Sequence, residues 1–411
     1  MSVTKYSWFL PMAIWCVACN NHTEEKKQQV RDSSTNANVT YASDADFLKR
    51  HTQHIIELQS EDAKAKVLLS ADYQGRVMTS TATGDSGTSY GWINYGLISA
   101  GEKKKQFNPV GGEERFWMGP EGGQYSIYFK AGDSFNIAHW QVPAIIDTIA
   151  YEVKQANKNQ AVFTKSVSLI NYSGTRFDIT IERQISLLTK QQISENLRVE
   201  IPAGINSVGY QTQNSITNSG DDWKKENGLL SIWLLGMFTP TQQTVVIIPF
   251  HPLKNARSFI TDNYFGAIPP GRLEIKDSVL FFTCDGKYRS KIGLSPAIAK
   301  PIAGSFDFKE NVLTLVIPSI DEQGMYVNSK WEIQKEPYKG DVINSYNDGP
   351  LQDGSQLGPF YEIESSSSVK ELKKGEKLEY NQVTCHLQGD YNSLRQLAQR
   401  LLGVDLDEIK R

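Results

Sequence analysis

Short runs of β-branched and aromatic residues recur through the middle of the chain, and several alternate apolar with polar positions. This period of two predicts β-strands with one buried face. The clearest runs are residues 67–69, 124–129, 178–183, 244–248 and 312–317. Clusters of Asn, Asp, Gly and Ser separate the runs and predict turns. Many short strands with turns between them predict an all-β fold, a large antiparallel β-sandwich.

Two segments carry the helical spacing of apolar residues instead. The first begins near Ser43, which is expected to cap it, and its face is formed by Phe47, Leu48, His51 and Ile55. The second ends at Gly403, and its face is formed by Leu394, Leu397, Ala398, Leu401 and Leu402. The sequence therefore predicts a short N-terminal helix and a C-terminal helix beside the sandwich.

The amino terminus has the pattern of a secretory signal over residues 1–18, with a positive charge at Lys5 and a short apolar run at 8–15. That run is too short to span a bilayer. It ends at Ala18-Cys19, which resembles a bacterial lipoprotein cleavage site; ordinary signal cleavage nearby is the alternative. Residues 19–40 are polar and predict a flexible tether. We expect a lipid anchor at Cys19 that attaches a folded domain, residues 41–411, to a membrane of the cell envelope, on its periplasmic or outer-membrane face.

Composition and motifs exclude several classes of function. The 411 residues are 39% hydrophobic, enough for a large core, and the formal net charge of -3 argues against a nucleic-acid partner. The sequence contains no P-loop, dinucleotide fingerprint, Gly-x-Ser-x-Gly, CxxC or EF-hand pattern, so neither a cofactor nor a metal is predicted. Cys284 and Cys385 lie in strand-like runs, and both a disulfide and two buried thiols remain open.

Residues 111–123 are the stretch that most resembles a binding site. Five glycines and a proline there predict a loop rather than the interior of a helix or central strand. The same stretch contains Arg115, Phe116, Trp117 and three acids. An aromatic face beside carboxylates and a guanidinium suits a saccharide, because the ring stacks on C–H groups while the charged groups bind hydroxyls. The alternative is that Phe116 and Trp117 are core residues and the acids face water.

Three segments together resemble the galactose-mutarotase-like superfamily and, within it, a family of secreted bacterial lipoproteins of unassigned function. Residues 111–121 resemble its Gly-Gly-x-Arg-x-Trp-x-x-Pro-Glu element, and residues 214–218 a central strand that ends in Asn. Residues 360–366, 372–376 and 383–387 resemble its closing strands. The resemblance implies a large β-sandwich that binds carbohydrate. It also implies a histidine on the central strand, which this chain lacks, so sugar mutarotation is in doubt.

The candidate site residues follow from these segments. Glu362 and Glu364 are two apart on an apparent strand, which puts both on one face, roughly 6.6 Å apart at about 3.3 Å per residue. Such a pair can divide acid and base roles, although a solvent-facing pair is the alternative. The candidate catalytic residues are Glu364, Glu362 and His139. The candidate substrate-binding residues are Arg76, Arg115, Trp117, Glu121 and Trp140.

Three hypotheses about function follow. The first is an envelope lipoprotein that binds a saccharide and modifies it by acid/base chemistry, by epimerisation or glycosidic cleavage. The second is a non-catalytic glycan-binding protein on the same fold. The third is a purely structural envelope protein. In an expected strand at 330–332, Lys330 and Glu332 share one face and Trp331 takes the other, so Trp331 is expected to be a core residue.

Overall fold

Antiparallel pairing between strands builds three sheets. The computed structural model describes residues 39–410; the predicted signal, Cys19 and residues 20–38 lie outside the described residues. The ten-stranded sheet contains, in spatial order, β12 (Leu273–Lys276), β13 (Val279–Thr283), β10 (Thr244–Pro249), β15 (Ala303–Asp307), β16 (Val312–Pro318), β19 (Lys377–Gln388), β8 (Asn206–Asn218), β7 (Arg176–Leu187), β6 (Gln160–Ile170) and β5 (Glu152–Ala156). The six-stranded sheet contains β11 (Ile260–Thr261), β14 (Ser290–Leu294), β17 (Ile343–Asn347), β18 (Tyr361–Ser366), β9 (Ser231–Phe238) and β4 (Arg115–Gly119). The three-stranded sheet contains β1 (Ile55–Gln59), β2 (Lys66–Ser70) and β3 (Arg76–Thr81).

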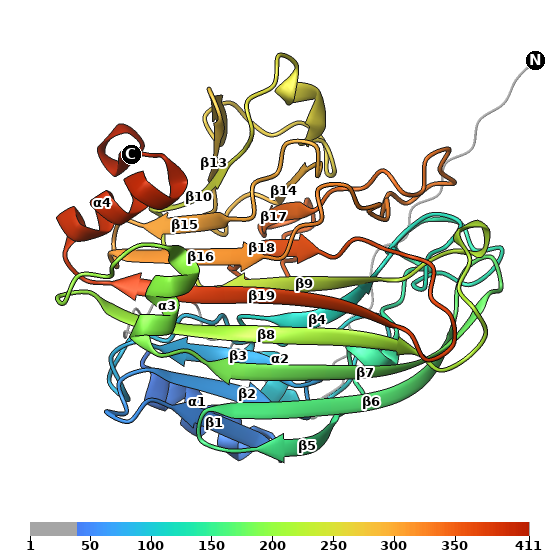
Figure 1. The fold of residues 1–411 in the computed structure, drawn as a ribbon, viewed down its shortest axis with the longest axis horizontal. Coiled ribbons are helices and arrows are strands. Elements are labelled where there is room, and N and C mark those ends of the chain that lie inside the picture. The colour runs from blue at the N-terminus through green and yellow to red at the C-terminus, as the bar shows by residue number, and fades with distance from the viewer. Residues whose placement is uncertain (1–38, 411) are drawn as a thin grey trace, which may run out of the picture. The chain divides into compact units, whose positions relative to one another are not determined.

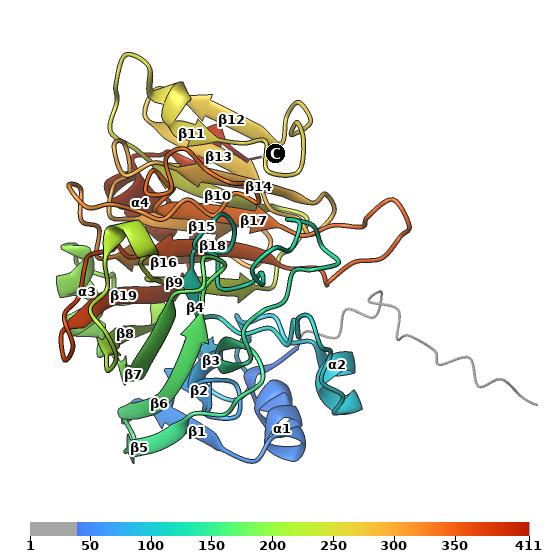
Figure 2. The same ribbon diagram turned by 90° about the vertical axis from the view of Figure 1, so that its right-hand side faces the viewer.

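The sheets form two layers. A bridge between Val77 of β3 and Glu114 joins the three-stranded sheet to the start of β4, so these two sheets share one layer. β2, β3 and β9 pack against β8, which makes the ten-stranded sheet the second layer. Figure 1 shows β19, β8, β7 and β6 side by side across the front of the view, and Figure 2 turns the molecule by 90°. Apolar side chains such as Phe116, Phe163 and Ile181 fill the space between the layers. This confirms the predicted all-β antiparallel sandwich.

The two predicted helices are present. α1 (Tyr41–His51) is capped by Thr40, whose side chain accepts a hydrogen bond from the backbone N–H of Ser43; Ser43 as the cap is therefore wrong. Ile55 opens β1 and does not belong to the helix. α4 (Tyr391–Leu402) ends as expected at Gly403, in the left-handed conformation. The helices not predicted are α2 (Tyr95–Ala100), α3 (Lys190–Leu197) and the short 3-10 turns η1 (Ala144–Ile146), η2 (Lys225–Asn227), η3 (Ala256–Phe259) and η4 (Leu406–Glu408).

Two predicted strands are wrong. Residues 124–129 form turns, although four of the predicted runs lie in β2, β7, β10 and β16. Ile127, Tyr128 and Phe129 are buried all the same, because this segment covers a sheet and does not join one. Residues 330–332 also lie in a loop, and Trp331 is only partly buried. Burial under a covering loop leaves the same apolar pattern in the sequence as burial in a strand.

A buried polar network ties the two layers together directly behind β4. Arg183 of β7 forms an ion pair of 2.7 Å with Glu114, and neither side chain is exposed. The other oxygen of Glu114 accepts hydrogen bonds from Thr212 of β8 and Gln382 of β19. Burial raises the pKa of Glu114, and Arg183 opposes that rise. Because Glu114 precedes Arg115, this network fixes the position at which β4 begins.

The structure decides between a disulfide and two free thiols for Cys284 and Cys385. Cys284 and Cys385 are both buried and unpaired, and burial raises the pKa of each thiol. They are therefore core residues without the ready reactivity of an exposed thiolate. Within residues 39–410, no helix is both long enough and apolar enough to cross a membrane.

Candidate functional site

Strand register brings the candidate residues to one face of the six-stranded sheet. Leu235 of β9 pairs with Arg115 of β4 on one side and with Glu364 of β18 on the other. Residues directly opposite in an antiparallel ladder point to the same face, so Arg115 and Glu364 share a face. By the same rule, Trp117 joins that face with its partner Trp233 of β9.

The same register extends the face outward from β18. Glu362 pairs with Tyr346 of β17, and Tyr346 pairs with Lys291 of β14. Ser365, which points the opposite way, donates a hydrogen bond to Gln382 of β19 in the other layer. Glu362 and Glu364 therefore point away from the ten-stranded sheet, onto the outer face of the six-stranded sheet.

Two ion pairs cross this outer face. Arg115 Nη2 lies 2.6 Å from Glu362 Oε1, and both side chains are almost fully buried. Lys291 Nζ lies 2.9 Å from Glu364 Oε2, and the indole N–H of Trp233 donates to the same oxygen at 3.0 Å. The carboxylate of Glu364 is thus held on one oxygen by two donors.

A third carboxylate, Glu121, completes the charged cluster from the segment that follows β4. Burial raises the pKa of Glu121 to about 7, against the opposing charge of Lys291 and with the support of Glu364. Burial also raises the pKa of Glu362 to about 7, although Arg115 opposes the change. For Lys291, burial alone would lower the pKa, but the carboxylates of Glu364 and Glu121 outweigh it and raise the pKa. Burial therefore raises the pKa of two carboxyl groups of this cluster to near neutral pH.

Aromatic rings line the cluster in an unbroken series. The centroids of Trp233 and Trp117 are 5.5 Å apart, and those of Trp117 and Tyr128 are 5.7 Å apart. Trp140 stacks on Tyr128 at 6.2 Å and on Trp331 at 5.9 Å. The Arg115 guanidinium lies 4.3 Å from the ring centre of Trp117, a cation–π contact. Apolar ring surface and charged hydrogen-bonding groups therefore alternate across the face.

Several polar atoms of the cluster are buried without a hydrogen-bond partner among the described residues. They are Glu364 Oε1, Arg115 Nε and Nη1, and the indole nitrogen of Trp117. Buried polar atoms are nearly always paired with protein, water or ligand, so these atoms are candidates for contact with a ligand. The donors and the acceptor here match the hydroxyl groups of a polyol.

Glycines allow a second loop to reach the cluster. A Cβ at Gly122 would lie 2.3 Å from the carbonyl oxygen of Lys330, and Gly123, at φ +82°, closely contacts Gln334. These contacts bring Trp331 beside Trp140. The predicted loop at 111–123 is thus partly wrong: Arg115 to Gly119 form β4, at the edge of its sheet, and turns flank the strand.

A second polar group lies on the Lys291 side of the face. Tyr264 donates a hydrogen bond of 2.5 Å to Asp341 and accepts one of 3.2 Å from Asn344 of β17. The Lys291 ammonium lies 5.7 Å from the ring centre of Tyr264. Burial raises the pKa of both Asp341 and Tyr264. These groups add a hydrogen-bonding wall beside Glu364.

The other two candidates lie outside this contact network. Arg76 is fully buried, where it donates to the Gly111 carbonyl and to Gln74, so it supports the turn before β4. His139 is exposed, and the described hydrogen bonds of its imidazole go to Ser134. Neither side chain forms a described hydrogen bond or ion pair with Glu121, Glu362 or Glu364.

Sequence reasoning missed several residues of the cluster: Trp233, Lys291, Asp341 and the role of Trp331. Trp233 is hidden in the apolar run of β9, which is buried along its whole length. Lys291 alternates with apolar residues in β14, and this pattern alone also fits an ordinary surface lysine. Only the pairing of β14 with β17 and β18 identifies it as the partner of Glu364.

Solved structures with a similar fold include galactose mutarotase-like proteins. The Slr1438 protein from Synechocystis sp. PCC 6803 is 13% identical, with 82% of this chain and 96% of that chain covered and a TM-score of 0.50. A galactose mutarotase-like protein from Lactobacillus casei is 10% identical, with 81% and 100% covered and a TM-score of 0.46. A galactose mutarotase related enzyme from Lactobacillus acidophilus is 11% identical, with 82% and 99% covered and a TM-score of 0.44. At 13% identity, the likeness to Slr1438 concerns the fold alone.

Among functionally curated proteins, none matches this sequence. One family model does match, over residues 39–411, which is nearly the whole chain and all of the described structure. The chain belongs to the family of unknown function DUF6786.

Proposed function

We propose that this protein is a cell-envelope lipoprotein that binds a saccharide on the outer face of its six-stranded sheet and transfers protons at the sugar. The observation that carries the proposal is the buried Glu121, with a pKa of about 7, beside Glu364, which is ion-paired with Lys291. Groups with a pKa near the working pH are the effective general acids and bases. The surrounding tryptophans supply the faces on which a sugar ring stacks.

The environment of each carboxylate assigns its role. Glu364 is the general base, because Lys291 and Trp233 hold one oxygen while Oε1 has no described partner. Glu121 is the general acid, because its raised pKa keeps it partly protonated at neutral pH and its side chain is partly accessible. Glu362 orients Arg115, which binds sugar hydroxyls. The exposed His139 has no role in this scheme.

The reaction class is proton transfer at the anomeric centre. A base that removes a proton from one oxygen and an acid that protonates another would open a sugar ring, and the same pair would assist cleavage of a glycosidic bond. Both reactions need an acid that still holds its proton near neutral pH, which the buried surroundings of Glu121 supply, and a base beside it, the role given to Glu364.

A second candidate function is glycan binding without chemistry. The direct Arg115–Glu362 ion pair and the aromatic series favour it, because both hold a ligand without needing any proton transfer. The two functions differ in what Glu364 does: it is essential for turnover in the first and contributes little in the second.

A screen on a glycan array, followed by a product assay on each bound glycan, tests the proposal. We expect the purified full-length protein in detergent to bind at least one saccharide and to speed its anomer interconversion or its cleavage. The matched variant is Trp331→Ala, which removes a partly exposed ring and leaves the buried ion pairs in place; it should weaken binding. Failure of the wild-type protein to bind any saccharide would refute both candidate functions.

A further inference from the structure

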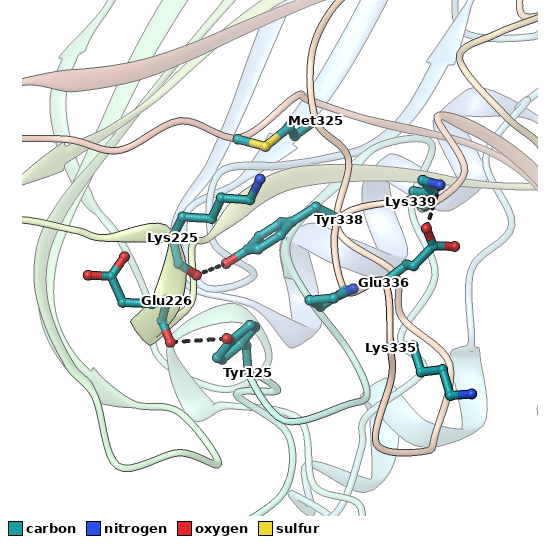
Figure 3. Close-up of a pocket in the computed structure, with 9 residues that line it drawn as sticks. Tyr125, Lys225, Glu226, Met325, Lys335, Glu336, Tyr338 and Lys339 are labelled. Atoms are coloured by element: carbon teal, nitrogen blue, oxygen red, sulfur yellow. Dashed lines mark hydrogen bonds and ion pairs between the residues drawn. The ribbon is translucent and has the colours of Figure 1, made fainter.

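An open depression is lined partly by the two loops that reach the proposed saccharide site, through Tyr125 on one and Tyr338 on the other. Its volume is about 620 Å³, within the range of about 300–1,000 Å³ that is typical of ligand pockets. Its lining includes Tyr125, Tyr338, Lys225, Glu226, Lys335 and Met325. Figure 3 shows the two tyrosines at the centre of this lining, with charged side chains around them.

Hydrogen bonds hold the two tyrosine rings in place. The Tyr125 hydroxyl donates to the Glu226 carbonyl at 3.0 Å, and the Tyr338 hydroxyl donates to the Lys225 carbonyl at 2.6 Å, as Figure 3 shows. The rings lie nearly parallel, with centroids 5.9 Å apart. The Lys225 ammonium lies 5.5 Å from the ring centre of Tyr338. A fixed aromatic wall beside flexible charged groups is the chemistry of a sugar subsite.

Two of the segments that line the depression also reach the proposed site. Glu121 of the site and Tyr125 of the depression are four residues apart, at most about 14 Å of extended chain. Trp331 and Tyr338 similarly share one loop. The Gln124 side chain joins the two loops: its amide donates to the Gln334 carbonyl at 2.9 Å and accepts from the Gln334 backbone N–H at 3.0 Å.

We infer that the depression is an outer subsite for further units of a saccharide chain, and that the substrate class is an oligosaccharide rather than a monosaccharide. This inference rests on the proposed function. One unit occupies the carboxylate cluster, and the following units extend toward the aromatic wall of Tyr125 and Tyr338. A chain longer than one unit therefore gains contacts that a monosaccharide does not make.

Chain-length ladders test the inference. Isothermal titration would compare glucose, galactose and mannose with the cello-, malto-, galacto- and manno-oligosaccharide series, up to the hexamers. We expect affinity to rise with chain length for at least one series. Tyr338→Ala and Lys225→Ala should lower the affinity of the longer members by roughly two- to tenfold and leave the monosaccharide unaffected. Lys225→Ala is a second test that leaves both tyrosines in place, so it remains informative if Tyr338→Ala disturbs the loop.

The matched control is Lys224→Ala, which removes the same charge from an exposed neighbour outside the depression and should change nothing. Binding that is independent of chain length in the wild type would overturn the outer subsite but leave the proposed function standing. The same holds if both variants bind the longer members as tightly as the wild type. If no sugar of any length binds, the proposed function fails and the subsite fails with it.

Discussion

Replacement of Glu121 by Gln should stabilise the protein above neutral pH and leave its stability unchanged in acid. Burial raises the pKa of Glu121 from an ordinary value of 4.5 to about 7, so the folded state holds a proton that the unfolded state has already released. Between about pH 4.5 and pH 7, folding of the wild type therefore becomes less favourable as the pH rises. Gln is close in shape to the protonated Glu and carries no charge to bury.

The size of the effect follows from the pKa. A rise from 4.5 to about 7 corresponds to about 3 kcal/mol of unfolding free energy once the pH exceeds both values. Because the Glu121 side chain is partly accessible to water, this figure is an upper limit. The expected difference, Glu121→Gln minus wild type, is close to zero at pH 4 and rises to as much as ~3 kcal/mol at pH 8.

Urea unfolding followed by circular dichroism at pH 4, 6 and 8 measures this difference. Glu362 also titrates in this range, but it does so in both proteins, and most of its contribution cancels. The control is Glu379→Gln on β19, where the carboxylate is exposed and the difference should stay flat with pH. A Glu121→Gln variant that is no more stable than the wild type at pH 8 would refute the burial argument.

Three further predictions concern the ion pair, the domain and the anchor. Lys291→Met leaves Glu364 buried without its cation and should lower the free energy of unfolding in urea by about 3–5 kcal/mol. The double variant Lys291→Met/Glu364→Gln should recover most of this loss. Equal stability of the single variant and the wild type would contradict the prediction. Limited proteolysis should trim about the first 40 residues and leave residues 41–411 whole, so a stable cut between two folded halves would show a second domain. Cys19→Ala should move the protein from the membrane to the soluble fraction, whereas a soluble wild type with an unmodified Cys19 would rule out lipidation.

Local spacing predicted part of the site. Glu362 and Glu364, like Arg115 and Trp117, are two residues apart within one strand, so each pair shares a face whatever the strand pairs with. The turn signals around β4 also indicated where the chain would bend. These features depend only on neighbouring residues, which sequence patterns report directly.

The remainder of the site depends on contacts between distant residues. Lys291 meets Glu364 only because β14, β17 and β18 are neighbours, and no pattern inside any one strand specifies that order. His139 precedes a buried tryptophan, but a tight loop turns the imidazole outward toward Ser134. Segment 124–129 reads as a strand because its apolar residues are buried by packing on a sheet, whereas no ladder bonds form there.

We propose that Glu364 transfers protons to and from a bound saccharide. Wild type and Glu364→Gln can be compared at pH 7 on the tightest glycan of the screen, with titration calorimetry for binding and a product assay for turnover. We expect a similar Kd for both proteins and a turnover that is roughly 10²–10⁴-fold lower in the variant. Equal turnover in the two proteins, or binding without any turnover in the wild type, would contradict it.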